Sequence, residues 1–237
     1  MSKRKAKNPV SSYLVLGLIV VFAIAVVAVL VISGTPKADS RTGSEYGPDP
    51  SIPRGITTDG LPYLGNADAA VTMRIYEDLG CHNCRDFFRD TEPSILENYV
   101  ATGKVKLEIY TLAFVNQSSL PAAEAAYCAQ DQDKYWEYRD ILFGNQGVVA
   151  FSRTNLVQWA EDLGMDTNAF ASCFDQEIYR QQIMDTSQQA LDVGVTGTPT
   201  SVINGERHVG VYAFDGAEGG SPGMKQFLDA ALTEAGG

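Results

Sequence analysis

Two cysteines separated by two residues, Cys81 and Cys84, have the types and spacing most suited to chemistry in this sequence. The apolar-rich run 71–76 before them predicts a strand, and the apolar-periodic run 85–89 after them predicts a helix. The first thiol would then lie at a helix N-terminus, where free backbone N–H groups and the positive end of the helix dipole stabilise a thiolate. We expect Cys81 to be the exposed nucleophile and Cys84 the buried thiol that resolves a mixed disulfide.

A metal site and a non-catalytic, peptide-binding chaperone module are alternative uses of such a pair. The sequence holds two histidines, His82 and His208, and no second C-x-x-C, so a closed tetrahedral zinc or copper site lacks obvious ligands. His208 lies in a predicted hairpin strand, and we expect it at the surface. The intact C-x-x-C argues against a purely binding role. We therefore predict no metal and no cofactor.

The N-terminus has the pattern of a membrane anchor. Four basic residues lie within the first seven positions, and an uncharged apolar run follows from 13 to 32. A run of roughly 20 such residues can cross a bilayer as a helix, whereas the apolar region of a cleaved signal peptide usually has about 7–15. We predict a basic cytoplasmic segment over 1–12, a transmembrane signal-anchor helix over 13–32 and an extracytoplasmic catalytic domain, with cleavage as the alternative.

Two regions follow the apolar run. Residues 33–60 are rich in Pro, Gly, Ser and Asp and lack an apolar period, which predicts a flexible linker, although a short edge strand around Ile56 is an open alternative. Residues 61–237 are long enough for one folded domain. No acidic residue precedes Asp39, so the part of the chain that follows the apolar run is more acidic than the net charge of −11 indicates. That charge argues against a nucleic-acid partner.

The periodicity within 61–237 predicts the order β-α-β, a helical insert, and β-β-α. The first helix should be interrupted at Pro93, and the helical insert should span about 118–193. Asn204-Gly205 predicts a tight hairpin turn between the last two strands. Aromatic residues such as Trp136 and Trp159 recur at helical spacing and are expected in the core.

This order resembles that of the DsbA-like branch of the thioredoxin superfamily. The resemblance rests on Cys81-His82-Asn83-Cys84 early in the domain, on Gly197-Thr198-Pro199-Thr200 late in it, and on the stretch 64–72, and it covers about residues 60–235. It implies an α/β protein with a thioredoxin fold and an inserted helical domain. The implied activity is that of a thiol:disulfide oxidoreductase. His82 and an oxidising compartment favour the direction that introduces disulfides into exported proteins. A disulfide isomerase or reductase of the same fold is the alternative.

The resemblance also implies a substrate-binding loop and a redox partner. Pro199 would have a cis peptide bond and lie against the C-x-x-C, and the backbone of Thr198 would be free to pair with an extended substrate peptide. The implied partners are exported proteins with cysteines and a quinone-linked membrane reoxidase of the DsbB or VKOR type.

Two carboxylates differ in position from the pattern of the family. Ile75 stands where many relatives have a buried Glu that acts in proton transfer. Glu77 and Asp78 are nearer to Cys81. Either of them takes over the proton-transfer role, or they are simply solvated.

The motif itself also differs from its relatives. His82 directly follows the first cysteine and Asn83 precedes the second, whereas DsbA-type proteins often have His in the latter place. Gly80 replaces the tryptophan that precedes the motif in thioredoxin. A donating or protonated His82 would stabilise the Cys81 thiolate, hence the reduced form, and make the disulfide more oxidising.

The remaining cysteines, Cys128 and Cys173, both lie in the predicted helical insert. We expect them to form a structural disulfide, which suits an oxidising compartment. Two separate buried thiols and a second redox pair are the alternatives. In the chain-entropy model, closing a loop of this length is worth about 4 kcal/mol.

Overall fold

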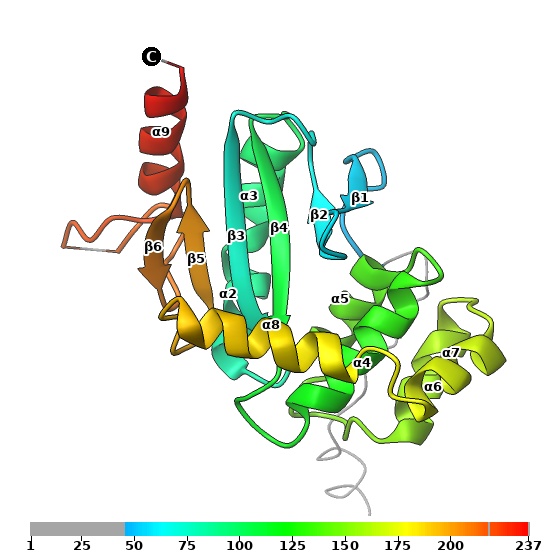
Figure 1. Ribbon diagram of the computed structural model, residues 1–237. Coiled ribbons are helices and arrows are strands. Elements are labelled where there is room, and N and C mark those ends of the chain that lie inside the picture. Colours follow the sequence, from blue (N-terminus) through cyan, green and yellow to red (C-terminus); the bar gives the residue numbers. More distant parts are fainter. Residues whose placement is uncertain (1–45, 218, 237) are drawn as a thin grey trace, which may run out of the picture. The chain divides into compact units, whose positions relative to one another are not determined.

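A six-stranded sheet in the order β1-β2-β4-β3-β5-β6 forms the centre of the domain (Figure 1). The computed structural model describes residues 46–217 and 219–236. The strands are β1 (Arg54–Ile56), β2 (Pro62–Leu64), β3 (Val71–Asp78), β4 (Val105–Leu112), β5 (Thr200–Ile203) and β6 (Glu206–Val209). β3 and β4 are parallel, whereas β5 and β6 continue the sheet in antiparallel fashion.

Nine helical segments surround the sheet in this part of the chain. They are α2 (His82–Asp90), α3 (Glu92–Ile95), the π-helix η2 (Leu96–Val100), α4 (Ser119–Gln130), α5 (Tyr135–Asn145), α6 (Arg153–Asp162), α7 (Thr167–Asp175), α8 (Arg180–Asp192) and α9 (Met224–Ala235). Figure 1 shows α2 and α3 behind β3 and β4, α8 crossing the opposite face, and α4 to α7 gathered beside one end of the sheet. The predicted order and the helical insert are confirmed.

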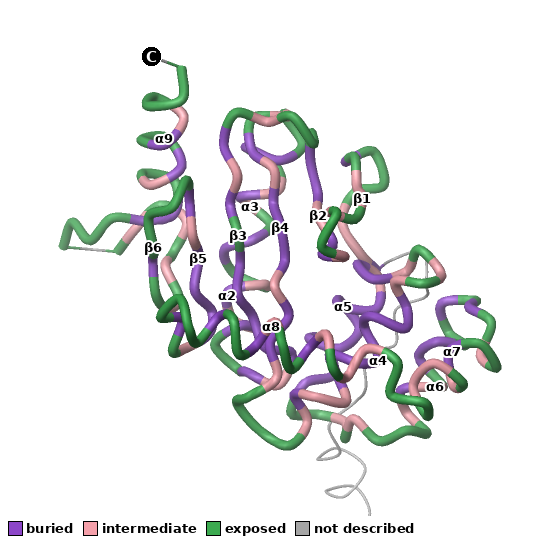
Figure 2. The backbone as a smooth tube through the Cα atoms, in the orientation of Figure 1, coloured by how far each residue is buried: buried purple, intermediate pink, exposed green. Residues whose placement is uncertain are grey.

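The two central strands are buried along most of their length (Figure 2). On β3, Val71, Met73 and Ile75 are fully buried and face the main core, as the alternation of side chains along a strand requires. Trp136 and Trp159 are 5% and 7% exposed, which confirms that they belong to the core.

Pro93 interrupts the first helix, as predicted. α2 ends at Asp90, Thr91 has φ −118° and ψ −47°, and Pro93 lies in the first turn of α3. A proline is tolerated in a first turn because the backbone donor that it lacks has no intrahelical acceptor there.

The predicted flexible linker is wrong for residues 46–60, which are part of the folded domain. Tyr46 and Ile52 are 7% and 4% exposed within the main core. β1 pairs with β2, with Ile56 opposite Pro62. The short edge strand around Ile56, which was the open alternative, is therefore present. The isolated apolar residues of this segment have no period because they pack singly, between turns, rather than along a helix or a strand face.

The predicted cytoplasmic segment 1–12, transmembrane helix 13–32 and first part of the linker lie outside the described residues. Within 46–217 and 219–236, no helix has both the length and the apolar character needed to cross a bilayer.

Candidate active site

The C-x-x-C lies at the turn between β3 and α2. β3 ends at Asp78, and Cys81 is the N-cap residue of α2, with φ −85° and ψ 122°. The carbonyl of Cys81 accepts from the backbone N–H groups of Cys84 at 3.1 Å and Arg85 at 3.2 Å, which begins the helix. The local sequence thus places the first thiol at a helix N-terminus.

Both active-site thiols are free and largely covered. Cys81 is 5% exposed and Cys84 is 2% exposed. The expectation of an exposed Cys81 is therefore wrong in this conformation, because the Thr198 loop packs over its sulfur. What distinguishes the two thiols is their electrostatic surroundings.

The pKa of Cys81 is lowered from an ordinary 9.0 to about 5. The hydrogen bond with the Cys84 thiol is the largest cause, burial acts against it, and the backbone N–H groups of Asn83 and Cys84 also lower the pKa. Burial raises the pKa of Cys84 far above its ordinary value, and the charge of Glu77 raises it further. Cys81 is therefore the thiolate and Cys84 remains a thiol at neutral pH.

A loop from the far end of the domain meets the C-x-x-C. The Thr198–Pro199 peptide bond is cis, directly before β5. The Cys81 Sγ lies 3.4 Å from the carbonyl oxygen of Thr198. The tertiary structure thus brings together the two motifs, which are more than a hundred positions apart in the sequence.

Glu77 is buried in an ion-pair cluster with Arg139 and Glu92. The Arg139 guanidinium donates to Glu77 at 2.6 and 2.7 Å and to Glu92 at 2.7 and 2.8 Å. The rings of Phe88 and Phe143 lie 5.0 and 5.1 Å from the guanidinium carbon, which completes its enclosure. Burial raises the pKa of Glu77, while Arg139 acts against that shift.

Asp78 ties the active-site turn to the loop after β4. Its carboxylate accepts from the backbone N–H groups of Gly80 at 2.8 Å and of Phe114 and Val115 at 3.0 Å each. Asp78 is fully buried and Glu77 is 1% exposed, so the alternative that these carboxylates are solvated is wrong.

Reasoning from the sequence missed Arg139 and Glu92. One signal was available, because Arg139 interrupts the apolar face of an otherwise aromatic helix, three residues after Trp136 and four before Phe143. A charge at such a position requires a buried partner. The partner itself, Glu92, has no local signal.

His82 and Asn83 lie on the first turn of α2, and both are exposed. The effect of His82 on the Cys81 thiolate stays a prediction. His208, which was expected at the surface, is 5% exposed and stacks on Phe227 with the ring centroids 3.8 Å apart. Its position on the sheet face beneath α9 explains this burial. In the described part of the chain, no cluster of three or more His, Cys, Asp or Glu residues is arranged to hold a metal.

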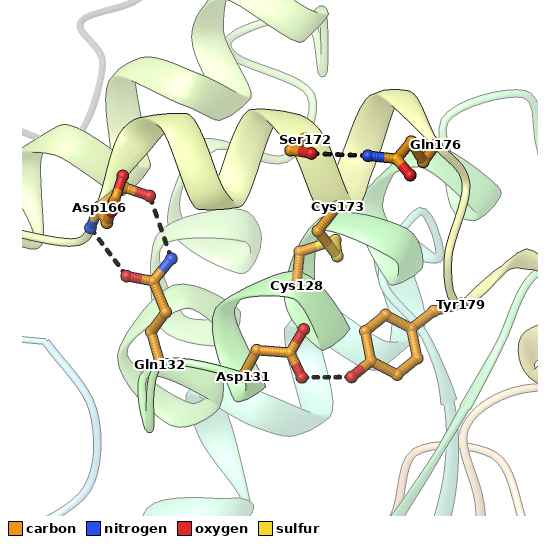
Figure 3. The surroundings of a disulfide bond; sticks show 8 residues. All are labelled: Cys128, Asp131, Gln132, Asp166, Ser172, Cys173, Gln176 and Tyr179. Carbon is orange, nitrogen blue, oxygen red and sulfur yellow. Dashed lines mark hydrogen bonds between the residues drawn. A yellow bond between two sulfur atoms is a disulfide. The ribbon is translucent and has the colours of Figure 1, made fainter.

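The second cysteine pair is joined in the structure. Cys128 on α4 and Cys173 on α7 have an S–S separation of 1.99 Å and a Cα–Cα separation of 5.8 Å. Figure 3 shows that a hydrogen bond between Asp131 and Tyr179 lies beside this disulfide. The bridge therefore connects two helices of the insert.

A mixed sheet, a C-x-x-C at a strand-to-helix turn, a facing cis-proline loop and a helical insert together define a thioredoxin-like fold of the DsbA type. A family model described as thioredoxin matches residues 57–218, and the chain belongs to this family. In the structure of oxidised BdbD from Bacillus subtilis, the fold is shared with a TM-score of 0.66 and 23% identity, over 75% of this chain and 96% of that one. For alpha-DsbA1 of Wolbachia pipientis the TM-score is 0.56 and the identity 22%, over 82% and 98% of the two chains.

Two kinds of curated relatives are similar in sequence. The Na(+)/H(+) antiporter NhaA 3 of Salinispora tropica is 30% identical over 175 residues, which are 73% of this chain and 26% of that protein. Disulfide bond formation protein D of Bacillus subtilis is 27% identical over 160 residues, which are 61% of this chain and 68% of that protein. The chain thus spans about a quarter of the antiporter relative and about two thirds of the disulfide-forming one.

Proposed function

We propose that this protein is an extracytoplasmic thiol:disulfide oxidoreductase that introduces disulfides into exported proteins. The single observation that carries the proposal is the opposite electrostatic environment of Cys81 and Cys84 at the start of α2. A stabilised Cys81 thiolate favours the reduced form of the protein, so the disulfide form is an oxidant. The curated relative named disulfide bond formation protein D supports this direction.

The reaction consists of two exchanges. A substrate thiolate attacks Sγ of Cys81 in the Cys81–Cys84 disulfide, forms a mixed disulfide and releases Cys84, which takes up a proton. A second substrate thiolate then attacks the substrate sulfur of the mixed disulfide and releases Cys81 as a thiolate. The substrate loses two electrons to the protein and gains a disulfide.

Several neighbouring residues serve these steps. The Thr198 backbone beside Pro199 pairs with the extended substrate peptide next to Cys81. The buried charge of Glu77 favours protonation of Cys84 as it leaves. Asp78 holds the turn from which both thiols project. Exposed His82 and Asn83 modulate the thiolate from the solvent side.

The proposal also includes a membrane anchor, a partner that reoxidises the protein and a role for the second disulfide. The apolar run 13–32 anchors the protein in the cell membrane as a single span, with the catalytic domain outside. A quinone-linked membrane reoxidase of the DsbB or VKOR type returns the dithiol to the disulfide. The disulfide between Cys128 and Cys173 has a structural role, and only the active-site pair takes part in thiol-disulfide exchange.

The role of each cysteine is tested by trapping. A Cys84→Ala variant lacks the resolving thiol and should accumulate mixed disulfides with exported proteins, whereas Cys81→Ala should not. Non-reducing electrophoresis followed by mass spectrometry identifies the trapped cysteine. Adducts on Cys81→Ala together with none on Cys84→Ala would reverse the assignment.

The direction of transfer is tested separately. The oxidised protein is incubated with a reduced, unfolded protein that contains cysteines, and the disulfides in that substrate are counted by alkylation and mass spectrometry. Transfer to the substrate supports the oxidase. No transfer, combined with efficient reduction or reshuffling of existing disulfides, would favour the reductase or isomerase.

A further inference from the structure

Three consecutive carbonyl oxygens of the active-site turn accept hydrogen bonds from two side-chain amides. Gln146 Nε2 donates to the carbonyls of Leu79 at 2.7 Å and Cys81 at 3.1 Å. Asn116 Nδ2 donates to the intervening carbonyl of Gly80 at 2.7 Å. Gln146 follows α5 and Asn116 precedes α4, so both amides come from the helical insert or its boundary.

The turn also packs directly against Asn116 and Ser119. A Cβ atom at Gly80 would lie 2.7 Å from both Asn116 Oδ1 and Ser119 Oγ. Real Cβ contacts are not that short, so a larger residue at this position would force the side chains of Asn116 and Ser119 to shift. This contact explains why the residue before Cys81 has no side chain.

Other contacts hold both residues in place. Gln146 is 7% exposed, and its backbone carbonyl accepts from Arg85 Nη1 at 3.1 Å. Asn116 Oδ1 accepts from the backbone N–H of Ser118 at 2.8 Å, and the Asn116 N–H donates to Ser119 Oγ at 3.0 Å. The two donors are therefore preorganised, and the turn does not have to recruit them.

We propose that Gln146 and Asn116 are positioning residues for the exchange reaction, which hold the carbonyls of the turn so that the backbone N–H groups of α2 face the Cys81 sulfur. This inference rests on the proposed function of Cys81 as the nucleophile. A carbonyl oxygen carries partial negative charge, and one that turned toward the sulfur would destabilise a thiolate. Held by an amide donor, the carbonyl keeps its orientation and part of its charge is compensated.

The test compares Gln146→Met with Gln130→Met. Both substitutions replace an amide by an apolar side chain of similar length. Gln130 Nε2 donates to the Gly60 carbonyl at 3.3 Å, at the end of α4, and serves as the matched control. The titration of Cys81 is followed by the ultraviolet absorbance of the thiolate in the reduced protein. The equilibrium with glutathione is measured alongside.

In Gln146→Met the pKa of Cys81 should rise by about half a unit to one unit, which shifts the glutathione equilibrium about 3- to 10-fold toward the protein disulfide. Gln130→Met should leave both quantities at their wild-type values. If the pKa of Cys81 is lowered in the wild type and has the same value in Gln146→Met, the proposal is overturned. A merely structural role of Gln146 would change the free energy of unfolding without changing these two readouts.

Asn116→Ala provides an independent variant, because Asn116 is exposed and its loss does not open the core. It should shift the pKa of Cys81 in the same direction, and an unchanged value would remove Asn116 from the proposal. These titrations are distinct from the trapping experiment. A failure to trap mixed disulfides on Cys84→Ala would reject the proposed function even if both amides control the thiolate.

Discussion

Arg139 and Glu77 form a bidentate ion pair inside the domain, with each side chain 2% exposed. Glu92 pairs with the same guanidinium from the start of α3. Two carboxylates thus share one cation, and the cluster carries a formal negative charge near Cys84. This arrangement links the helical insert, through α5, to the end of β3 and to the environment of the resolving thiol.

Replacing Arg139 should strongly destabilise the domain. Arg139→Met leaves Glu77 and Glu92 buried without a cation, and breaking a buried ion pair in this way costs about 3–5 kcal/mol. Arg153→Met is the control, because Arg153 pairs with Asp175 at the surface, where such a pair contributes about 0–1 kcal/mol. Urea unfolding of both variants measures the difference. Equal losses would contradict the interpretation of the buried cluster.

The stability of the reduced protein should depend on pH through Cys81. The pKa of Cys81 is about 5 in the folded protein and 9.0 is its ordinary value, so the stabilisation is complete above pH 9 and is lost as pH falls through 5. Between these values the free energy of unfolding of the reduced protein, relative to the oxidised protein, should rise by about 1.4 kcal/mol per pH unit.

Urea unfolding of the two redox forms at several pH values measures this dependence. Cys81→Ala, measured in its reduced form, is the control and should lack the rise. A constant difference between the reduced and oxidised proteins from pH 5 to 9 would show that Cys81 has no perturbed pKa.

Removing the disulfide of the insert should cost stability without abolishing exchange. The double substitution Cys128→Ala and Cys173→Ala opens a loop with a sequence separation of 45, and the expected loss is about 2–4 kcal/mol. The equilibrium of the active-site pair with glutathione should remain unchanged, because the bridge joins α4 to α7, two helices of the insert. Peptide mass spectrometry of the non-reduced wild type checks the pairing, and free thiols at both positions would refute it.

A methyl group at Gly80 should disturb the active-site turn. Gly80→Ala places Cβ against Asn116 and Ser119, and the resulting overpacking is expected to cost about 1–3 kcal/mol. Gly197→Ala is the stability control, because no atom lies within 4 Å of the corresponding Cβ. Thermal unfolding compares the two. If Gly80→Ala is as stable as Gly197→Ala, the close approach of the insert is not a constraint.

Much of the fold follows from local patterns. The alternation in β3, the helix start at Cys81 and the interruption at Pro93 depend on neighbours within one or two turns, and they are found where the sequence predicts them. Local patterns did not predict that the segment 46–60 belongs to the folded domain. Tyr46 and Ile52 pack as single residues into a core made by distant elements, and no local period marks them.

The sequence by itself determined that two thiols lie at the start of a helix, that a helical insert separates two parts of a sheet, and that a Thr-Pro loop follows the insert. Only the tertiary structure decided how that thiol pair is surrounded. The packing buries Glu77 against Arg139, and it brings the side-chain amide of Gln146 to the carbonyls of Leu79 and Cys81. These partners are more than 60 positions apart in the sequence, and their contacts arise from packing of the insert against the sheet, which no local spacing encodes.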